Sequence, residues 1–148
     1  MSNKAPSKQD VRFILAEDIR PEIMGKLSVQ GFIPGETFFV GGKPPPELGP
    51  NVAFAVPSLT FLFVITGGEG KFDGRFRVIG PDKKTMVVDT PAEKPIEKIK
   101  GKAALFATAS KPFVGPAFGT YAVELELGSS KFRFSMTVQK GPKNLPAK

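Results

Sequence analysis

Residues 119–139 read GTYAVELELGSSKFRFSMTVQ and contain two alternating segments on either side of the turn Gly128-Ser129-Ser130. The apolar positions are Tyr121, Val123, Leu125 and Leu127 before the turn and Phe132, Phe134, Met136 and Val138 after it. Apolar residues at every second position on both sides of a turn predict a β-hairpin with one buried face. Because a two-stranded hairpin alone is only marginally stable in water, other strands must cover that face.

The rest of the chain contains further short segments of strand character, separated by turns rich in glycine and proline. They are residues 11–16, 25–32, 37–40, 58–66, 74–79, 85–89 and 102–108. Many short strands without a long helical pattern are typical of an antiparallel β-sandwich, here of about seven to nine strands. We therefore expect one all-β domain over residues 11–139, a disordered leader over residues 1–10 and a disordered basic tail over residues 140–148.

One short motif refines the predicted fold. Residues 119–123, Gly-Thr-Tyr-Ala-Val, resemble the tyrosine corner of immunoglobulin-like sandwiches, in which a tyrosine opens the penultimate strand two residues before a core position. In this resemblance Val123 holds the place of a disulfide cysteine in antibody domains. The resemblance implies an antiparallel immunoglobulin-like β-sandwich and carries no information about function.

A second resemblance extends over most of the chain. Residues 15–20 (LAEDIR) and 25–28 (GKLS), followed by Gly31, resemble the opening of a family of small bacterial proteins classified as a domain of unknown function. Members of that family also end in a Gly-x-Tyr strand and an aromatic-rich last strand. The resemblance implies an immunoglobulin-like β-sandwich, and it offers no catalytic residues to carry over.

Three residue types that carry much of protein chemistry are missing from the sequence, because it contains no cysteine, histidine or tryptophan. The absence of cysteine excludes disulfides, thiolate metal sites and a cysteine nucleophile. The absence of histidine removes the commonest general base near neutral pH and the commonest transition-metal ligand. We therefore expect a protein without catalytic apparatus and without a cofactor.

The apolar segments are too short to cross a membrane. The most apolar run, residues 52–66, is interrupted by Pro57 and falls short of the roughly 20 residues that a membrane-spanning helix needs. The first ten residues lack the apolar stretch of a secretory signal. These observations predict a cytoplasmic protein that does not bind membranes.

The net charge of +7 comes mainly from the two ends of the chain. Residues 1–9 and 140–148 contain five of the 21 basic residues and no acidic one, which leaves 16 basic and 14 acidic residues between them. A basic, aromatic sheet face containing Arg75, Arg77 and Arg133 would suit single-stranded nucleic acid. However, the neighbouring phenylalanines share the period of the buried face, so we do not expect specific nucleic-acid binding.

Residues 41–57 form a long segment rich in proline and glycine, which includes the run Pro44-Pro45-Pro46. Consecutive prolines cannot donate to a β-ladder and favour an extended path, so this segment is either a binding loop or a crossover connection between two sheets. The candidate interaction surface combines it with residues 111–118, and comprises Pro44, Pro45, Pro46, Leu48, Phe54, Phe113 and Phe118.

Three functions fit this sequence. The first is a protein-interaction or accessory module that contacts an unknown protein partner through the loop of residues 41–57, or associates with itself through an edge strand. The alternative is a small-molecule or glycan binder, with a concave pocket lined by Phe54, Phe113 and Phe118. The third is a hydrolase that uses the carboxylates of Glu17 and Asp18.

Acidic residues gather in two parts of the sequence and could hold a cation. The first group is Glu17, Asp18 and Glu22, but we favour a turn in which Asp18 accepts backbone hydrogen bonds and Arg20 pairs with a neighbouring carboxylate. The second group is Glu69, Asp73, Asp82 and Asp89, which lack the regular spacing of a calcium loop. The glycine-rich residues 67–71 lack the spacing and the following helix of a phosphate-binding loop.

Overall fold

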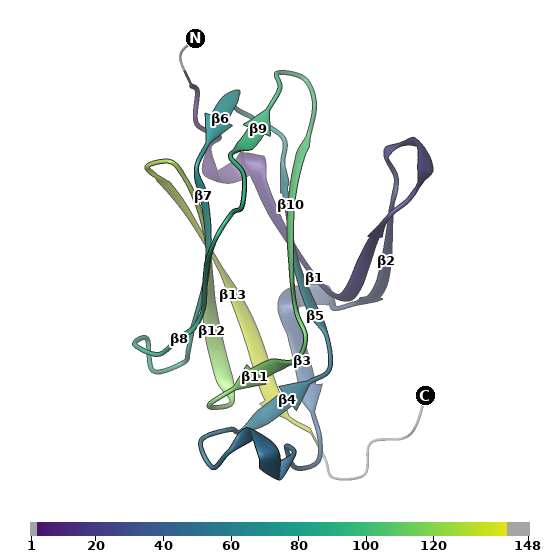
Figure 1. The fold of residues 1–148 in the computed structure, drawn as a ribbon, viewed down its shortest axis with the longest axis vertical. Coiled ribbons are helices and arrows are strands. Elements are labelled where there is room, and N and C mark those ends of the chain that lie inside the picture. The colour runs from purple at the N-terminus through teal and green to yellow at the C-terminus, as the bar shows by residue number, and fades with distance from the viewer. Residues whose placement is uncertain (1–2, 142–148) are drawn as a thin grey trace.

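The computed structural model describes residues 3–141, and it has an all-β fold. These residues form thirteen strands and four short 3-10 helices. Two large sheets of four and five strands face each other as a β-sandwich, and four short strands form two small ribbons at its ends (Figure 1). The prediction of about seven to nine strands therefore describes the two large sheets but misses the four short strands.

The four-stranded sheet is antiparallel throughout, with the order β10-β5-β1-β2. Its strands are β10 (Ala104–Ser110), β5 (Leu59–Ile65), β1 (Val11–Pro21) and β2 (Leu27–Phe32). All residues of β5 except Val64 are buried, as expected for an apolar strand inside a sheet. The last part of β1 and all of β2 stand away from the sandwich on the right of Figure 1.

The five-stranded sheet has the order β3-β13-β12-β7-β8. Its strands are β3 (Thr37–Val40), β13 (Ser130–Lys140), β12 (Gly119–Leu127), β7 (Gly74–Ile79) and β8 (Met86–Pro91). The predicted hairpin of residues 119–139 is confirmed as β12 and β13, and the predicted pairing of β7 with β8 is confirmed as well. One pair departs from the predicted antiparallel pattern, because β3 and β13 run parallel.

The two ribbons lie at opposite ends of the sandwich (Figure 1). At one end β4 (Phe54–Val56) pairs with β11 (Phe113–Gly115), and at the other end β6 (Gly70–Phe72) pairs with β9 (Ile96–Lys98). From the sequence, β4 was expected to be part of the loop of residues 41–57 and β9 part of a connector. Three-residue strands contain too few residues for an alternating pattern to show.

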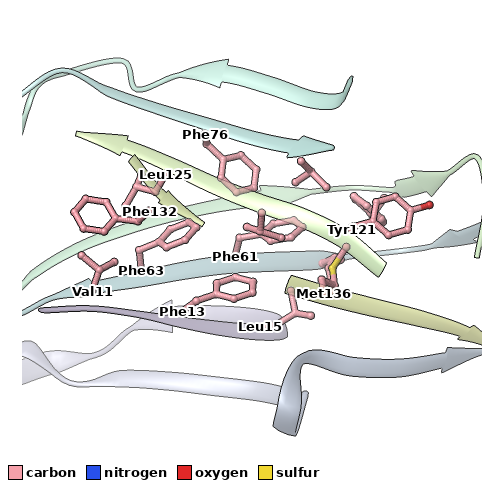
Figure 2. Close-up of a cluster of buried hydrophobic side chains, with 14 of the residues drawn as sticks. Val11, Phe13, Leu15, Phe61, Phe63, Phe76, Tyr121, Leu125, Phe132 and Met136 are labelled. Atoms are coloured by element: carbon pink, nitrogen blue, oxygen red, sulfur yellow. The ribbon is translucent and has the colours of Figure 1, made fainter. Parts of the chain in front are cut away.

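The core lies between the two large sheets and follows the period of two that the sequence displays. Every second residue at the start of β1 points inward, and so do alternate residues of β7, β12 and β13. Figure 2 shows these side chains interleaving between the layers; the labelled ones are Val11, Phe13, Leu15, Phe61, Phe63, Phe76, Tyr121, Leu125, Phe132 and Met136. Aromatic contacts connect the layers, because the ring centroid of Phe61 lies 4.9 Å from that of Phe76.

Tyr121 is fully buried at the start of β12. Its hydroxyl donates a hydrogen bond to the carbonyl of Ala117, four residues earlier, and the Ala117 N–H lies 3.4 Å from the same oxygen. Burial raises the pKa of Tyr121, so the hydroxyl remains a donor. The polar end of this aromatic residue therefore fixes the turn that leads into the final hairpin.

Both expected terminal segments are in part attached to the domain. Lys4 exchanges two backbone hydrogen bonds with Glu69, and the Asn3 amide donates to the Lys71 carbonyl. Residues 3–10 therefore lie against the sandwich, in contrast to the disordered leader expected for residues 1–10. At the other end, β13 continues to Lys140, and the Gly141 N–H donates to Val40; the remainder of the expected tail, residues 142–148, lies outside the described residues.

Between residues 3 and 141 we find no helix with the length and apolar character needed to span a membrane.

Candidate functional site

Two of the predicted contact residues belong to the core. Phe54 is 1% exposed and Phe113 is 0% exposed, and both rings pack against the ring of Tyr121. Phe118 is half-buried, with its ring centroid 5.3 Å from that of Phe54. Because the pairing of β4 with β11 turns Phe54 and Phe113 inward, these rings fill the interior and do not line the open pocket that the sequence analysis proposed.

The two predicted loops nevertheless meet at this end of the sandwich. On the outside of the β4–β11 ribbon lies an apolar hollow of about 340 Å³, in which Glu47 is the one charged lining residue. Its apolar lining consists of Pro45, Leu48, Ala55, Val56, Pro57 and Pro112. Of the predicted contact residues, Pro45 and Leu48 are exposed and line this hollow. Pro44, which precedes Pro45, is half-buried, and Pro46 is the first residue of the 3-10 helix Pro46–Leu48.

Residues 41–53 connect β3 of the five-stranded sheet to β4 and β5, and β5 belongs to the four-stranded sheet. The interpretation of this proline-rich segment as a crossover between two sheets is therefore confirmed.

A hairpin that the sequence analysis did not predict projects from the sandwich. The first strand was expected to end at Ala16, but β1 continues to Pro21 and pairs with β2 along the whole of that extension. Pro21 is the last residue of the strand, where its missing N–H costs no ladder hydrogen bond. We call residues 17–32 the arm.

The arm carries the densest group of exposed apolar side chains in the described residues. Ile23 and Met24 at its tip are 81% and 85% exposed, and on β2 Val29 is 40% and Phe32 is 59% exposed. Single exposed apolar residues are ordinary on protein surfaces, but a group of four within ten residues of a projecting hairpin is a candidate contact surface.

The tip of the arm has a tight turn. Met24 has φ 64° and Gly25 has φ 71°, both in the left-handed region. The Glu22 N–H donates to Lys26 across the turn at 2.8 Å. The sequence signal for this turn is the motif Ile23-Met24-Gly25, in which a glycine follows two apolar residues. These two apolar side chains lie at the tip of a hairpin and do not reach the core.

The charges of the arm are paired or dispersed. Asp18 accepts a hydrogen bond from Arg20 Nε at 2.7 Å, and this bond lowers the pKa of Asp18. Glu17 and Asp18 are consecutive strand residues, so their side chains point to opposite faces. The structure therefore does not bring Glu17 and Asp18 together as the carboxylate pair that hydrolysis would require.

The two candidate cation clusters are not assembled either. Within residues 3–141, no group of three or more acidic side chains lies close enough to hold a metal ion. Asp82 caps its own turn by accepting backbone hydrogen bonds from Lys84 and Thr85, and Asp89 is engaged by Arg75. These carboxylates have structural partners.

The arginines considered for nucleic-acid binding belong to a ladder of alternating charge on the outer face of the five-stranded sheet. In the strand register Asp89 lies opposite Arg77, Arg77 opposite Glu124, and Glu124 opposite Arg133. Arg75 forms a two-point hydrogen bond with Asp89, at 2.7 and 3.0 Å. The positive charges of this face are thus matched by carboxylates, which leaves little net attraction for a polyanion.

The sheets end in four edge strands, namely β10, β2, β3 and β8. In β10 the side chains alternate between partly buried and exposed, and Leu105 is 47% exposed. The apolar arm, the apolar hollow and the edge of β10 are the three surface features of the described residues that suit contact with another molecule.

No protein-family model matches this chain, and no curated protein matches it.

Proposed function

We propose that the protein is a non-catalytic interaction module that binds another protein through the arm. The observation that carries this proposal is the exposure of Ile23, Met24, Val29 and Phe32 on one projecting hairpin. Burying these side chains against a partner would contribute on the order of 1.5–3 kcal/mol for each one that becomes fully covered.

The chemistry of the arm defines the kind of partner. The carboxylate of Asp18 already accepts a hydrogen bond from Arg20, and the tip residues Ile23 and Met24 are uncharged. The partner therefore presents an apolar groove into which the tip inserts, with methionine adapting to the shape of that groove. We further propose that the protein acts in the cytoplasm, in keeping with a sequence that contains no cysteine.

We also propose that the sandwich is of the immunoglobulin-like type. Two features support this assignment: the hydrogen bond from the Tyr121 hydroxyl to Ala117, and the position of Tyr121 two residues before the buried Val123 on the penultimate strand. Membership of the family of small bacterial proteins that the sequence resembles is a proposal on the same footing. Most of residues 15–31, which contain the motifs that resemble this family, lie in the arm.

The test compares two double variants that differ only in position. Ile23→Ser with Met24→Ser removes the apolar tip of the arm, whereas Met86→Ser with Ile99→Ser removes the same two residue types from exposed sites elsewhere. Tagged proteins are recovered from an extract of their own cells and weighed by native mass spectrometry at two salt concentrations. Circular dichroism establishes that each variant is folded.

We expect the unmodified protein and the control variant to retain one defined protein partner at both salt concentrations. The arm variant should lose that partner, because its contact surface is gone. Equal retention of the partner by both variants would exclude the arm as the contact. Recovery of nucleic acid that dissociates at the higher salt would instead indicate an electrostatic association.

The hollow lined by Pro45, Leu48 and Pro112 favours a second function, the binding of a small apolar molecule. The probe for it is a fluorescent apolar dye added to the purified protein. Leu48→Arg should abolish dye binding, while the double variant of Ile23 and Met24 should leave the hollow intact. Dye binding that disappears only in the arm variant would contradict this second function.

A further inference from the structure

The edge strand β10 lacks three of the features by which proteins protect a sheet edge. Within Ala104–Ser110 there is no charged residue, no proline and no break in the pairing with β5. Its seven residues pair with β5 in continuous register, so the edge is long enough to accept another strand. Beside it, Phe106, Ala107 and Thr108 line a hollow of about 570 Å³ together with residues of the segment 90–96. Among the described strands, β5 is the one hydrogen-bonded neighbour of β10.

The other three edges are protected. The strand β8 contains Asp89, ends in Pro91 and lies next to an irregularity at Val78 and Ile79. The strand β2 contains Gly31, which has φ 63° and lies beneath the side chain of Glu17. The strand β3 is only four residues long. The edge of β10 is thus the one that suits strand addition.

We propose that β10 pairs antiparallel with β10 of a second copy, joining two four-stranded sheets into one continuous sheet across a two-fold axis at Ala107. The sequence of the strand is complementary to itself in this register. The opposed pairs are Ala107 with Ala107, Phe106 with Thr108, Leu105 with Ala109, and Ala104 with Ser110. Each large residue meets a small one, and no like charges face each other within the seven residues.

The outer face of the joined sheet explains the exposure of Leu105. In the observed register Ala107 lies beside Leu62, and Leu62 beside Ile14, so this row is apolar up to the edge. Pairing at Ala107 continues the same row into the second copy. It also places the 47% exposed side chain of Leu105 against Ala109 of the second copy, which would cover part of its apolar surface.

The residues just outside the strand predict how salt affects the dimer. Lys102 and Lys111 flank β10, and in the proposed register Lys111 lies one position from Lys102 of the second copy. Two positive charges at this spacing repel each other, and salt screens that repulsion. The dimer should therefore become stronger as salt is added, whereas an association through nucleic acid would become weaker. This inference is independent of the proposed role of the arm.

The experiment uses the purified full-length protein. Because the sequence contains no cysteine, each introduced thiol is the only one in the chain. Ala107→Cys places two thiols opposite each other on the two-fold axis, at a Cα separation of about 4.5–5.5 Å, within the range of a disulfide. In Ala109→Cys the equivalent atoms would be at least about 13 Å apart, which a disulfide cannot span. The second variant is therefore the matched control.

Under mild oxidation we expect Ala107→Cys to form covalent dimers and Ala109→Cys alone to remain monomeric. A mixture of Ala109→Cys with Leu105→Cys should form crosslinked pairs, because these positions face each other in the proposed register. Crosslinking of Ala109→Cys with itself, or none by Ala107→Cys, would overturn the proposal.

Sedimentation velocity over a dilution series tests the dimer without a crosslink. Ala107→Lys places two like charges at the axis and should raise the dissociation constant by at least about tenfold, whereas Ala107→Ser should leave it within a factor of two or three. Ala107 is exposed, so both variants should fold. A monomer at every concentration, or a dimer that Ala107→Lys does not weaken, would exclude β10 as the interface.

Discussion

Glu124 lies directly opposite Arg133 in the register of β12 and β13, and Arg133 Nε donates to Glu124 Oε2 at 2.8 Å. The carboxylate is only 2% exposed although it stands on the outer face of the sheet. Arg77 lies opposite Glu124 from the other side. A buried acidic residue on a sheet surface is thus held between two guanidinium groups.

Removing that carboxylate should destabilise the protein. Glu124→Ala leaves Arg133 and Arg77 without their central partner, and we expect the free energy of unfolding to fall by about 2 kcal/mol. Glu126→Ala is the control, because Glu126 is 24% exposed and water replaces part of its contacts; it should cost about 0.5–1 kcal/mol. Urea unfolding followed by circular dichroism measures both, and equal losses would contradict the central position of Glu124.

The tyrosine hydroxyl at the entrance to the final hairpin should contribute to stability. Tyr121→Phe keeps the buried ring but leaves the Ala117 carbonyl without its donor, and we expect a loss of about 1–1.5 kcal/mol. Because Tyr121 is the chain's single tyrosine, unfolding is followed by far-ultraviolet circular dichroism. Thr120→Ala removes an exposed hydroxyl bond to Thr137 and should cost only a few tenths of a kcal/mol. If Tyr121→Phe cost no more unfolding free energy than Thr120→Ala, the hydrogen bond from the Tyr121 hydroxyl would not stabilise the turn before β12.

The close approach of two core residues makes Gly115 intolerant of a side chain. A Cβ added there would overlap the ring of Phe54 and lie 2.8 Å from the Tyr121 hydroxyl oxygen. Gly115→Ala should therefore cost at least about 2–3 kcal/mol of folding free energy. Gly101→Ala meets no atom within 4 Å and should cost about 1 kcal/mol through its backbone conformation alone. Adding Phe54→Leu to Gly115→Ala should recover part of the loss, and a lack of recovery would contradict the overlap.

The turn between β7 and β8 should loosen in acid. A hydrogen bond from the Thr85 hydroxyl, with backbone bonds from Thr85 and Lys84, lowers the pKa of Asp82 from 3.8 to about 2. Because the folded-state pKa is the lower one, the stabilisation is complete above about pH 4 and is lost as pH falls towards 2. The amide resonances of Lys84 and Thr85 should titrate with a midpoint near pH 2, and Asp82→Asn should abolish that titration. A midpoint near 3.8 would mean that these bonds do not hold the carboxylate.

Alternating apolar patterns were sufficient to predict most of the large strands. The hairpin of residues 119–139 has two long alternating segments joined by a short turn, which the structure narrows to Gly128 and Ser129, and its pairing followed directly. The turn at residues 80–84 identified the pairing of β7 with β8 in the same way. Where a strand has one buried face and one exposed face, the alternation of its side chains identifies both the strand and its inward face.

Residues 25–32 were expected to form a strand, and β2 confirms this, but the extension of β1 and the projection of the arm could not be predicted by the same reasoning, because the arm has no buried side. Its strand continues through Glu17 and Asp18, where charged residues resemble a turn, and its tip contains Ile23 and Met24, where apolar residues resemble a core segment. Apolar residues alternate along a strand when one of its faces is buried. A hairpin that projects from the sandwich has no buried face, so its sequence does not show this alternation.

The charge ladder was readable only after the strands had been paired. Arg75 and Arg77, Glu124 and Glu126, and Lys131 and Arg133 each occur two residues apart, and their signs alternate between neighbouring strands. In the sequence Arg75 and Arg77 stand 47 to 51 positions before Glu124 and Glu126, so no local window shows that these charges pair. The same holds for Phe54 and Phe113, whose inward orientation depends on a ribbon formed by two three-residue strands.

The parallel pairing of β3 with β13 determines when the protein can be completed. Thr37–Val40 are synthesised first, and their partner strand, which ends at Lys140, follows about one hundred residues later. Until then Phe38 and Phe39 have no strand beside them, and pairing them closes a loop of about one hundred residues, an entropic cost that slows the final step. A chain in which β13 has not yet formed is therefore prone to aggregate through β3, and deleting β13 would leave β3 permanently unpaired.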